Sequence, residues 1–343
     1  MKSTIFAISL LAAFSFYTKA QDLPIKDKGK TVTVSTKVMD NYTGHYRIET
    51  MSLVIEIVRE ENSLYAIVAG MGKLQLTAGT ETAFFNNDIQ AQIEFPDEKN
   101  KAKKLTLYQA GQQLTGIRID PPKELTYEKI AVGTSRIDYS KTYQAFESEW
   151  NLIIRDDTVG SASIHLRHTI YHNEPAYHGG SVIRYNSMGN KPFADMGFFA
   201  KKDFRLLEAR NAISQKDEVI GTLSGSTLRQ STFNINTGEI IETKIINLNE
   251  PIFGSGIYKL LSMELKTDMT VEFPVSGFDD IAWEKAHISA REVMHVEALN
   301  RTYNAWKVEY SSGTIKWISN EAPYLIKWQM PTGMIWELKK LLK

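Results

Sequence analysis

The last forty residues constrain the fold most, because apolar and polar residues alternate there in four short runs separated by turns. A period of two is the pattern of a β-strand with one buried face. Turn-forming residues separate the runs at 311–313, 320–323 and 331–333. The pattern predicts a four-stranded antiparallel meander with one aromatic face. That face is expected to carry Trp306, Trp317, Trp328 and Trp336.

Short β-type runs also fill most of the preceding chain. A β-branched run at 53–58 is followed by a turn at 62–63, and isoleucines flank a hairpin-type turn at 236–238. Helical spacing stands out at 257–263, and we find no alternation of strands with helices. The predicted fold is mostly β, with a small antiparallel β-domain followed by a larger curved antiparallel sheet, a half-barrel with few helices.

The N-terminus has the layout of a secretory signal peptide. Lys2 precedes a short apolar run at 5–16, and Ala20 offers a small residue for cleavage. The run is shorter than the roughly 20 apolar residues that a spanning helix needs. We therefore expect residues 1–20 to direct export to the periplasm and the mature chain to have no transmembrane segment.

Composition shifts divide the rest of the chain. Residues 21–37 are a polar lead-in, 38–118 a small β-domain, and 119–148 a linker or connecting segment that contains Pro121 and Pro122. Residues 149–343 form the larger curved-sheet domain. A chain of 343 residues is long enough for two such domains.

Charge and cysteine content exclude several classes of function. The chain has 40 basic and 40 acidic residues, whereas nucleic-acid binding needs a clustered excess of positive charge. It has no cysteine, which excludes disulfides, thiol nucleophiles, Cys-ligated zinc and a lipid-modified cysteine. We expect no cofactor and no nucleic-acid partner.

The histidines are the clearest candidates for catalytic or metal chemistry. On one strand, His165 and His168 point to opposite faces, and His168 lies roughly 13 Å from His172 at about 3.3 Å per residue. His172 and His178 are able to meet across a turn at Pro175. A metal-dependent hydrolase that combines these histidines with distant carboxylates is therefore one alternative function, although no metal ligand is assigned.

Other catalytic patterns are missing from the sequence. No Gly-x-Ser-x-Gly elbow and no glycine-rich phosphate loop occurs. The acidic pairs at 156–157 and 279–280 lie beside turn-prone residues, where aspartate satisfies backbone N–H groups. The sequence therefore predicts no catalytic residue and no enzyme activity.

Residues 38–118 resemble the small domain of unknown function that follows serine β-lactamase-like domains in exported bacterial proteins. The resemblance rests on Tyr42, Gly44, Tyr46, Asn62, Ser63, Leu64, Tyr65, Leu74, Phe84, Phe85, Ile93, Phe95, Leu105 and Gly111. The sequence has no lactamase domain, so the resemblance implies no hydrolase activity.

Residues 149–343 are similar to exported bacterial domains related to the periplasmic lipoprotein-carrier (LolA-like) fold. The matching positions are 157–160, 203–208, 317–319, Pro323, Leu325, Trp328 and 337–338. That fold implies a strongly curved antiparallel sheet with a helical lid over an apolar concavity. The paired helices of the carriers' lid are not visible in this sequence.

The expected function is that of a non-catalytic periplasmic binding protein. The four C-terminal tryptophans would line a concave face that holds an apolar or amphipathic ligand, such as a lipid. The alternative is an envelope module that binds another protein and holds no small ligand. An open sheet edge or exposed apolar patch would favour that alternative.

Overall fold

The computed structural model describes residues 31–48, 53–68, 72–96, 101–109, 112–186, 192–212, 217–254, 257–276 and 281–342. The predicted signal peptide lies outside these residues. The chain divides into two compact units: residues 1–124 with 331–333, and residues 125–330 with 334–343. We call them the barrel unit and the curved-sheet unit, and describe each by itself. The prediction of a mostly β protein with few helices is confirmed.

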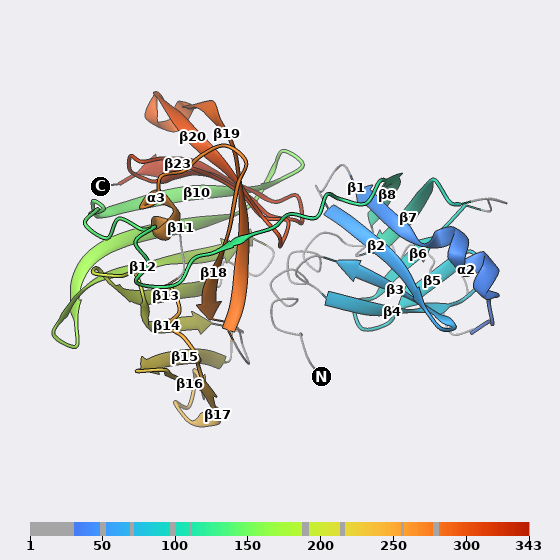
Figure 1. Cartoon of the computed structure of the whole chain (residues 1–343), viewed down its shortest axis with the longest axis horizontal. Helices are drawn as coiled ribbons and strands as arrows, with labels where there is room; N and C mark the ends of the chain where they lie inside the picture. The colour runs from blue at the N-terminus through green and yellow to red at the C-terminus, as the bar shows by residue number, and fades with distance from the viewer. Residues whose placement is uncertain are drawn as a thin grey trace. The chain divides into compact units, whose positions relative to one another are not determined.

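The barrel unit begins with a short helix, α2 (Thr36–Tyr42), capped by the Ser35 side chain, which accepts from the Val38 N–H at 3.3 Å. Eight antiparallel strands then close on themselves, because β1 pairs with both β2 and β8 (Figure 1). The strands are β1 (Gly44–Ile48), β2 (Leu53–Glu60), β3 (Ser63–Val68), β4 (Gly72–Ala78), β5 (Ala83–Asn86), β6 (Ala91–Glu94), β7 (Lys104–Gln109) and β8 (Gln112–Ile119). Closure removes every free sheet edge from β1–β8.

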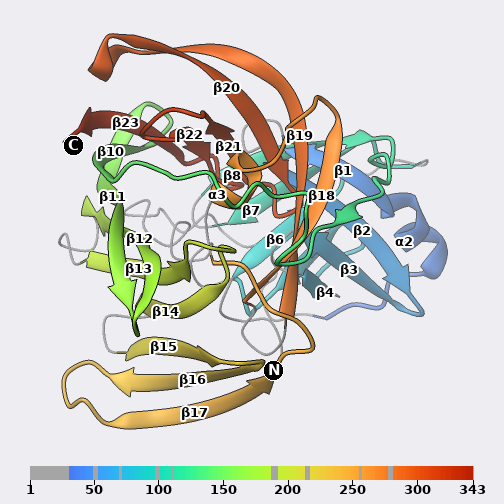
Figure 2. The same cartoon turned by 60° about the vertical axis from the view of Figure 1, so that its left-hand side comes forward.

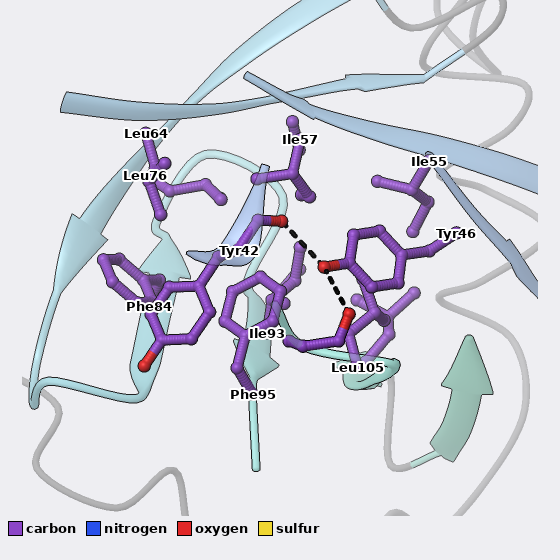
Figure 3. Packing of buried hydrophobic residues seen from close by; sticks show 14 of the residues in the cluster. Tyr42, Tyr46, Ile55, Ile57, Leu64, Leu76, Phe84, Ile93, Phe95 and Leu105 are labelled. Atoms are coloured by element: carbon purple, nitrogen blue, oxygen red, sulfur yellow. Dashed lines mark hydrogen bonds between the residues drawn. The ribbon is translucent and has the colours of Figure 1, made fainter. Parts of the chain in front are cut away.

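Alternating residues of the barrel strands form its core. In β2, for example, Leu53, Ile55 and Ile57 are buried. Tyr42 stacks on Phe95 with ring centroids 4.2 Å apart, and the hydroxyl of Tyr46 donates to the Tyr42 carbonyl at 2.7 Å (Figure 3). The buried Tyr46 hydroxyl is therefore satisfied by an internal hydrogen bond, as a low-dielectric core requires.

The curved-sheet unit contains a 15-stranded sheet with the order β17-β16-β15-β14-β13-β12-β11-β10-β23-β22-β21-β20-β19-β18-β9. The strands from the start of the unit to β17 are β9 (Glu128–Lys129), β10 (Phe146–Ile154), β11 (Asp157–Tyr171), β12 (Glu174–Tyr185), β13 (Pro192–Ala200), β14 (Leu206–Ala212), β15 (Asp217–Ser224), β16 (Thr227–Asn234) and β17 (Ile240–Asn247). The remaining strands are β18 (Met269–Ser276), β19 (Ile281–Val296), β20 (Arg301–Tyr310), β21 (Ile315–Ile318), β22 (Leu325–Gln329) and β23 (Ile335–Leu341).

The sequence predicted several local features of this unit correctly. Strands β20 to β23 are consecutive neighbours, which confirms the C-terminal meander. The hairpin of β16 and β17 is present, and the helical spacing near 257–263 corresponds to the single turn α3 (Tyr258–Leu261). A 3₁₀ turn, η3 (Glu297–Leu299), connects β19 to β20. None of the described helices has the length and apolarity needed to cross a bilayer.

The two faces of the large sheet differ in character. We call the face that carries Trp150, Phe273 and Val308 the inner face, because these side chains are buried. α3 lies on this side, where the ring of Tyr258 stacks parallel to that of Tyr177 at 6.5 Å, and the strands bend around it (Figure 2). We call the opposite face the outer face; Lys307 and Glu309 form an ion pair there.

One end of the inner face is filled by aromatic side chains. Tyr143 contacts Tyr258 and Tyr324 at centroid distances of 4.9 and 5.2 Å, and its hydroxyl lies 2.5 Å from Ser262 Oγ. Tyr143 belongs to the connection before β10, which is anchored at β9 by parallel pairing with β18. The connection therefore packs against the sheet and closes this end of the interior.

Candidate ligand-binding site

Three of the four predicted tryptophans share the inner face, and one does not. Trp328 pairs with Trp336 in register, and Trp306 lies on the same side because Val308 pairs with Lys316, the partner of Trp328. Trp317 pairs with Lys307 and points to the outer face, where its indole N–H donates to Glu292 at 2.7 Å. The prediction of one shared aromatic face is therefore wrong for Trp317. Its position in β21 is one residue out of phase with Trp328 in β22.

Burial separates the three inner-face tryptophans further. Trp336 is 1% exposed and Trp306 is 8% exposed, covered by the Arg291 guanidinium at 4.5 Å. Trp328 is half-buried, and its ring lies 4.4 Å from that of Trp336 at an interplanar angle of 30°. Trp328 is thus the indole of this group with a partly accessible surface.

Trp328 and Trp336 both bury an indole N–H for which no described protein atom acts as acceptor. A buried donor left unpaired costs about 1–3 kcal/mol. Buried polar groups are nearly always hydrogen-bonded, so a buried donor without an acceptor in a native structure needs an explanation. The two unpaired donors lie on adjacent strands with their rings in contact.

Charged residues surround the same place. The Lys316 ammonium lies 4.9 Å from the centroid of the Trp328 ring, a cation–π distance. On α3, Lys259 is 2% exposed and bonds to the Glu284 carboxylate of β19 at 2.8 Å. Asp195 of β13 lies on the inner face, since it pairs with Ser181, the partner of buried-face residue Ile164. Two bases and two acids therefore project into the interior.

The pKa shifts show that these charges interact through the interior. Burial raises the pKa of Asp195, and the Lys316 ammonium partly opposes that shift. In the sheet, β13 lies six strands from β21, which is about 29 Å along a flat sheet at 4.8 Å per strand. At that separation screening would leave little interaction. The strands of this unit curve around α3 (Figure 2), which is the bend that an interaction between Asp195 and Lys316 requires.

The site holds both charge signs in a partly desolvated setting. Burial lowers the pKa of Lys316, with Glu284 opposing this and Lys259 adding to it. Burial alone would raise the pKa of Glu284, but the ammonium groups of Lys259 and Lys316 hold it below its ordinary value. Both side chains lie within the curve of the sheet, where surrounding protein atoms shift their pKa values, yet water still reaches Asp195 and part of Lys316. This arrangement offers N–H donors and a cation to an anionic or acceptor head group.

The histidines do not gather at this site. The β11–β12 hairpin turns at His172 and Asn173, whose φ values of 47° and 63° fit a type I′ turn. The predicted meeting of His172 and His178 is therefore wrong, because His172 is itself in the turn and His178 pairs with Arg167.

The histidine pair that does form lies on the outer face. His165 Nε2 is 3.4 Å from His178 Nδ1. Burial, with His178 and Arg167 adding to it, lowers the pKa of His165 to about 4. His168 Nε2 lies 2.6 Å from the carbonyl oxygen of Tyr143 and so donates to it. Within the described ranges, no three His, Asp or Glu side chains are placed to hold a metal ion.

The remaining sequence candidates occupy turns. Asp156 forms the β10–β11 turn with Arg155, at φ values of 69° and 51°, as the turn interpretation predicted. The acidic pair at 279–280 and residues 255–256 lie outside the described residues. In the barrel, a cavity of about 40 Å³ is walled mainly by aliphatic side chains. Two of its polar lining residues, Asn86 and Gln109, donate from their side-chain amides to backbone carbonyls at 2.9 and 3.2 Å.

Sequence reasoning missed Asp195, Lys259, Glu284 and Lys316. The available signal was a charged residue at a strand position that alternation assigns to the buried face. Glu284, for example, is two residues before the buried Ala286, whereas Lys316 stands between the apolar Ile315 and Trp317, so that alternation alone places it outward. Charged residues are rarely buried without a partner. A charged residue at such a position is therefore a candidate site residue, as the residues of an aromatic stripe are.

Comparison with known proteins gives one distant match. The chain is 27% identical over 114 residues to penicillin-binding protein 4* of Bacillus subtilis (strain 168). The match covers 33% of this chain and 25% of that protein, so the chain spans about a quarter of the length of this relative. The match agrees loosely with the expected resemblance to a domain appended to β-lactamase-like proteins.

No family model matches the chain. No solved structure matches it either. The resemblance of the curved-sheet unit to the lipoprotein-carrier fold stays a prediction, because no comparison supports it.

Proposed function

We propose that this chain is an exported, non-catalytic binding protein whose curved-sheet unit holds an amphipathic ligand on its inner face. The observation that carries the proposal is the pair of orphan indole donors, Trp328 and Trp336, beside the half-exposed Lys316. The ligand's acceptor or anionic head group lies against these donors, and its apolar part lies along the exposed portion of the Trp328 ring.

The polar chemistry favours an anionic head group. A charge-assisted hydrogen bond is roughly twice as strong as a neutral one. An anion at the two indoles would also offset the cost of Lys316 in a partly buried position, where burial lowers its pKa. A carboxylate would therefore offset three unfavourable contributions, namely the two unpaired indole N–H groups and the partly buried ammonium of Lys316.

Apolar surface supplies the rest of the affinity. Each methylene that leaves water contributes about 0.8 kcal/mol. The aromatic packing around Tyr143 closes the far end of the interior, so a long tail has limited room there. We therefore expect a single-chain amphiphile rather than a large multi-chain lipid.

A dansyl-labelled undecanoic acid tests the proposal by its fluorescence on binding. We expect uptake by the purified chain, and a roughly tenfold weaker affinity after Lys316→Gln, since a charged contact is worth about 1.4 kcal/mol or more. Lys327→Gln is the matched control, because Lys327 covers Trp317 on the outer face at 5.2 Å. Native mass spectrometry of the purified chain also reveals any lipid carried from the cell.

Two results would overturn the proposal. One is a clean mass without bound lipid together with no uptake of the dansyl probe. The other is equal loss of affinity in the two lysine variants, which would place the probe away from the inner face.

A second candidate is the protein-interaction module. It is favoured by exposed isoleucines on the terminal strand β17, of which Ile245 is 69% exposed. Exposed apolar groups along an open edge mark a surface for strand addition. A purified chain that takes up no dansyl probe would shift the balance toward this role.

A further inference from the structure

Strand β17 ends the large sheet, and no described strand pairs with its outer edge. An unpaired edge exposes a row of backbone N–H and C=O groups, which proteins usually blunt with proline, bulges or charges. β17 carries Ile240, Ile241 and Ile245 at 57%, 56% and 69% exposure. It is an eight-residue edge without proline that carries exposed isoleucines beside Glu242 and Lys244 and has a bulge at Ile241.

The register shows which residues face the open edge. The Leu248 N–H donates to the Ser226 carbonyl, so these two residues form a hydrogen-bonded pair of the antiparallel ladder. Such pairs recur at every second residue, so Leu228 and Ile246 form the next one. Even-numbered residues at this end of β17 therefore bond inward to β16. The backbone groups of Thr243 and Ile245 point outward.

We propose that two copies of this chain pair antiparallel through the outer edges of β17, with the two-fold axis at Thr243. A closed C₂ dimer of this kind joins the two sheets into one. The proposal is independent of the ligand site, because β17 lies at the opposite end of the sheet order from β18 and β19.

Charge complementarity selects this register. β17 carries Glu242 and Lys244, two residues apart on the same face and both exposed. With the axis at Thr243, Glu242 of each copy lies directly opposite Lys244 of the other, which makes two attractive cross-strand pairs. With the axis at Glu242 or Lys244, like charges meet, and a parallel in-register pairing opposes like charges at both positions. Opposite charges at this spacing therefore point to a second copy as the occupant.

The apolar residues fit the same register. Ile241 is the extra residue of a β-bulge between Ile240 and Glu242, and in this register it lies near Ile245 of the other copy, so exposed isoleucines of both copies gather at the joined edges. Cross-strand pairs of β-branched residues each contribute about 0.2–1 kcal/mol. At the axis, Thr243 of one copy faces Thr243 of the other, and these small side chains do not clash.

Charge reversal tests the register. We expect the purified chain to sediment as a dimer, and Glu242→Lys to weaken dimerisation by about tenfold or more, since it sets lysine against lysine at two positions. The double variant Glu242→Lys with Lys244→Glu restores both attractive pairs and should restore the dimer. Glu239→Lys, a reversal in the preceding turn, is the matched control.

A single cysteine gives an independent readout, because the chain contains none. In a hydrogen-bonded antiparallel pair the Cα atoms lie about 5.5 Å apart, within disulfide range. Thr243→Cys should therefore form a disulfide-linked dimer under mild oxidation, while Thr237→Cys in the exposed turn should not.

Three outcomes would overturn the proposal. The first is a wild-type chain that remains a monomer at every concentration reached. The second is a dimer that is unaffected by Glu242→Lys. The third is equal cross-linking at positions 243 and 237, which would indicate random collision. The cysteine variants keep the test decisive if a charge variant folds poorly.

Discussion

The two units differ in whether their β-sheets have free edges. Strands β1–β8 close into a barrel, whose core holds the buried Tyr46 hydroxyl in an internal hydrogen bond. The curved sheet stays open, ends in an exposed strand and carries Asp195, Glu284 and Lys316 on its inner face. A closed barrel uses its interior for stability, whereas an open, bent sheet leaves an interior and an edge for other molecules.

The largest expected effect tests whether the two cores are separate. Phe95→Ala removes the ring stacked on Tyr42 and should cost the barrel about 3–5 kcal/mol of unfolding free energy. All six tryptophans lie in the curved-sheet unit, so indole fluorescence reports that unit alone. Urea unfolding should show the barrel transition moving in far-UV circular dichroism while the fluorescence midpoint stays fixed.

Trp150→Ala is the reciprocal variant, because Trp150 is 0% exposed in the curved-sheet core. It should lower the fluorescence midpoint and spare the barrel transition. If either variant moves both transitions equally, the units unfold as one and the contrast between them fails.

A smaller effect comes from the charged inner face. Glu284→Gln leaves the Lys259 ammonium, 2% exposed, without its carboxylate and should cost about 3 kcal/mol. Glu309→Gln on the outer face removes a surface partner of Lys307 and should cost about 1 kcal/mol or less. The measurement is urea unfolding followed by indole fluorescence.

The same variant has a signature in pH. The pKa of Glu284 is held below its ordinary value of 4.5, so its contribution is present above that pH and lost as pH falls through the lower folded pKa. Wild-type stability should therefore fall more steeply below pH 4.5 than that of Glu284→Gln. If the unfolding free energies of the two proteins fall equally with pH, the buried Lys259–Glu284 ion pair does not contribute to stability as expected.

The smallest effect concerns the outer face of the same sheet. Burial lowers the pKa of His165 from 6.5 to about 4, so the neutral ring contributes stability above pH 6.5 that is lost as pH falls toward 4. His165→Asn should flatten this part of the stability profile. His172→Asn, in the exposed turn, should leave it unchanged.

Local patterns made much of this fold predictable. Alternation defined the meander β20–β23, and turn chemistry placed Asp156 and residues 236–238 in turns, although Asp157, the other member of that acidic pair, begins β11. The wrong inferences came from phase and register. A single residue decides whether Trp317 faces inward, and the turn at His172 and Asn173 decides which histidines pair.

The candidate site was less predictable because it depends on curvature. Asp195 and Lys316 are 121 positions apart in the sequence and six strands apart in the sheet, and only the bend brings them into interaction. Alternation shows which residues face inward but not how far the sheet curls. The sequence therefore predicted that Trp306, Trp328 and Trp336 share one face but not the charges that accompany them.

The most direct test of the central claim is the indole region of a ¹⁵N nuclear magnetic resonance spectrum. Six tryptophans give six indole N–H signals, which Trp→Phe variants assign. On titration with dodecanoate, the signals of Trp328 and Trp336 should shift together downfield as their N–H groups gain an acceptor, while that of Trp317 stays in place. Unmoved signals from Trp328 and Trp336 at saturating dodecanoate, or a shift of Trp317 instead, would contradict the account.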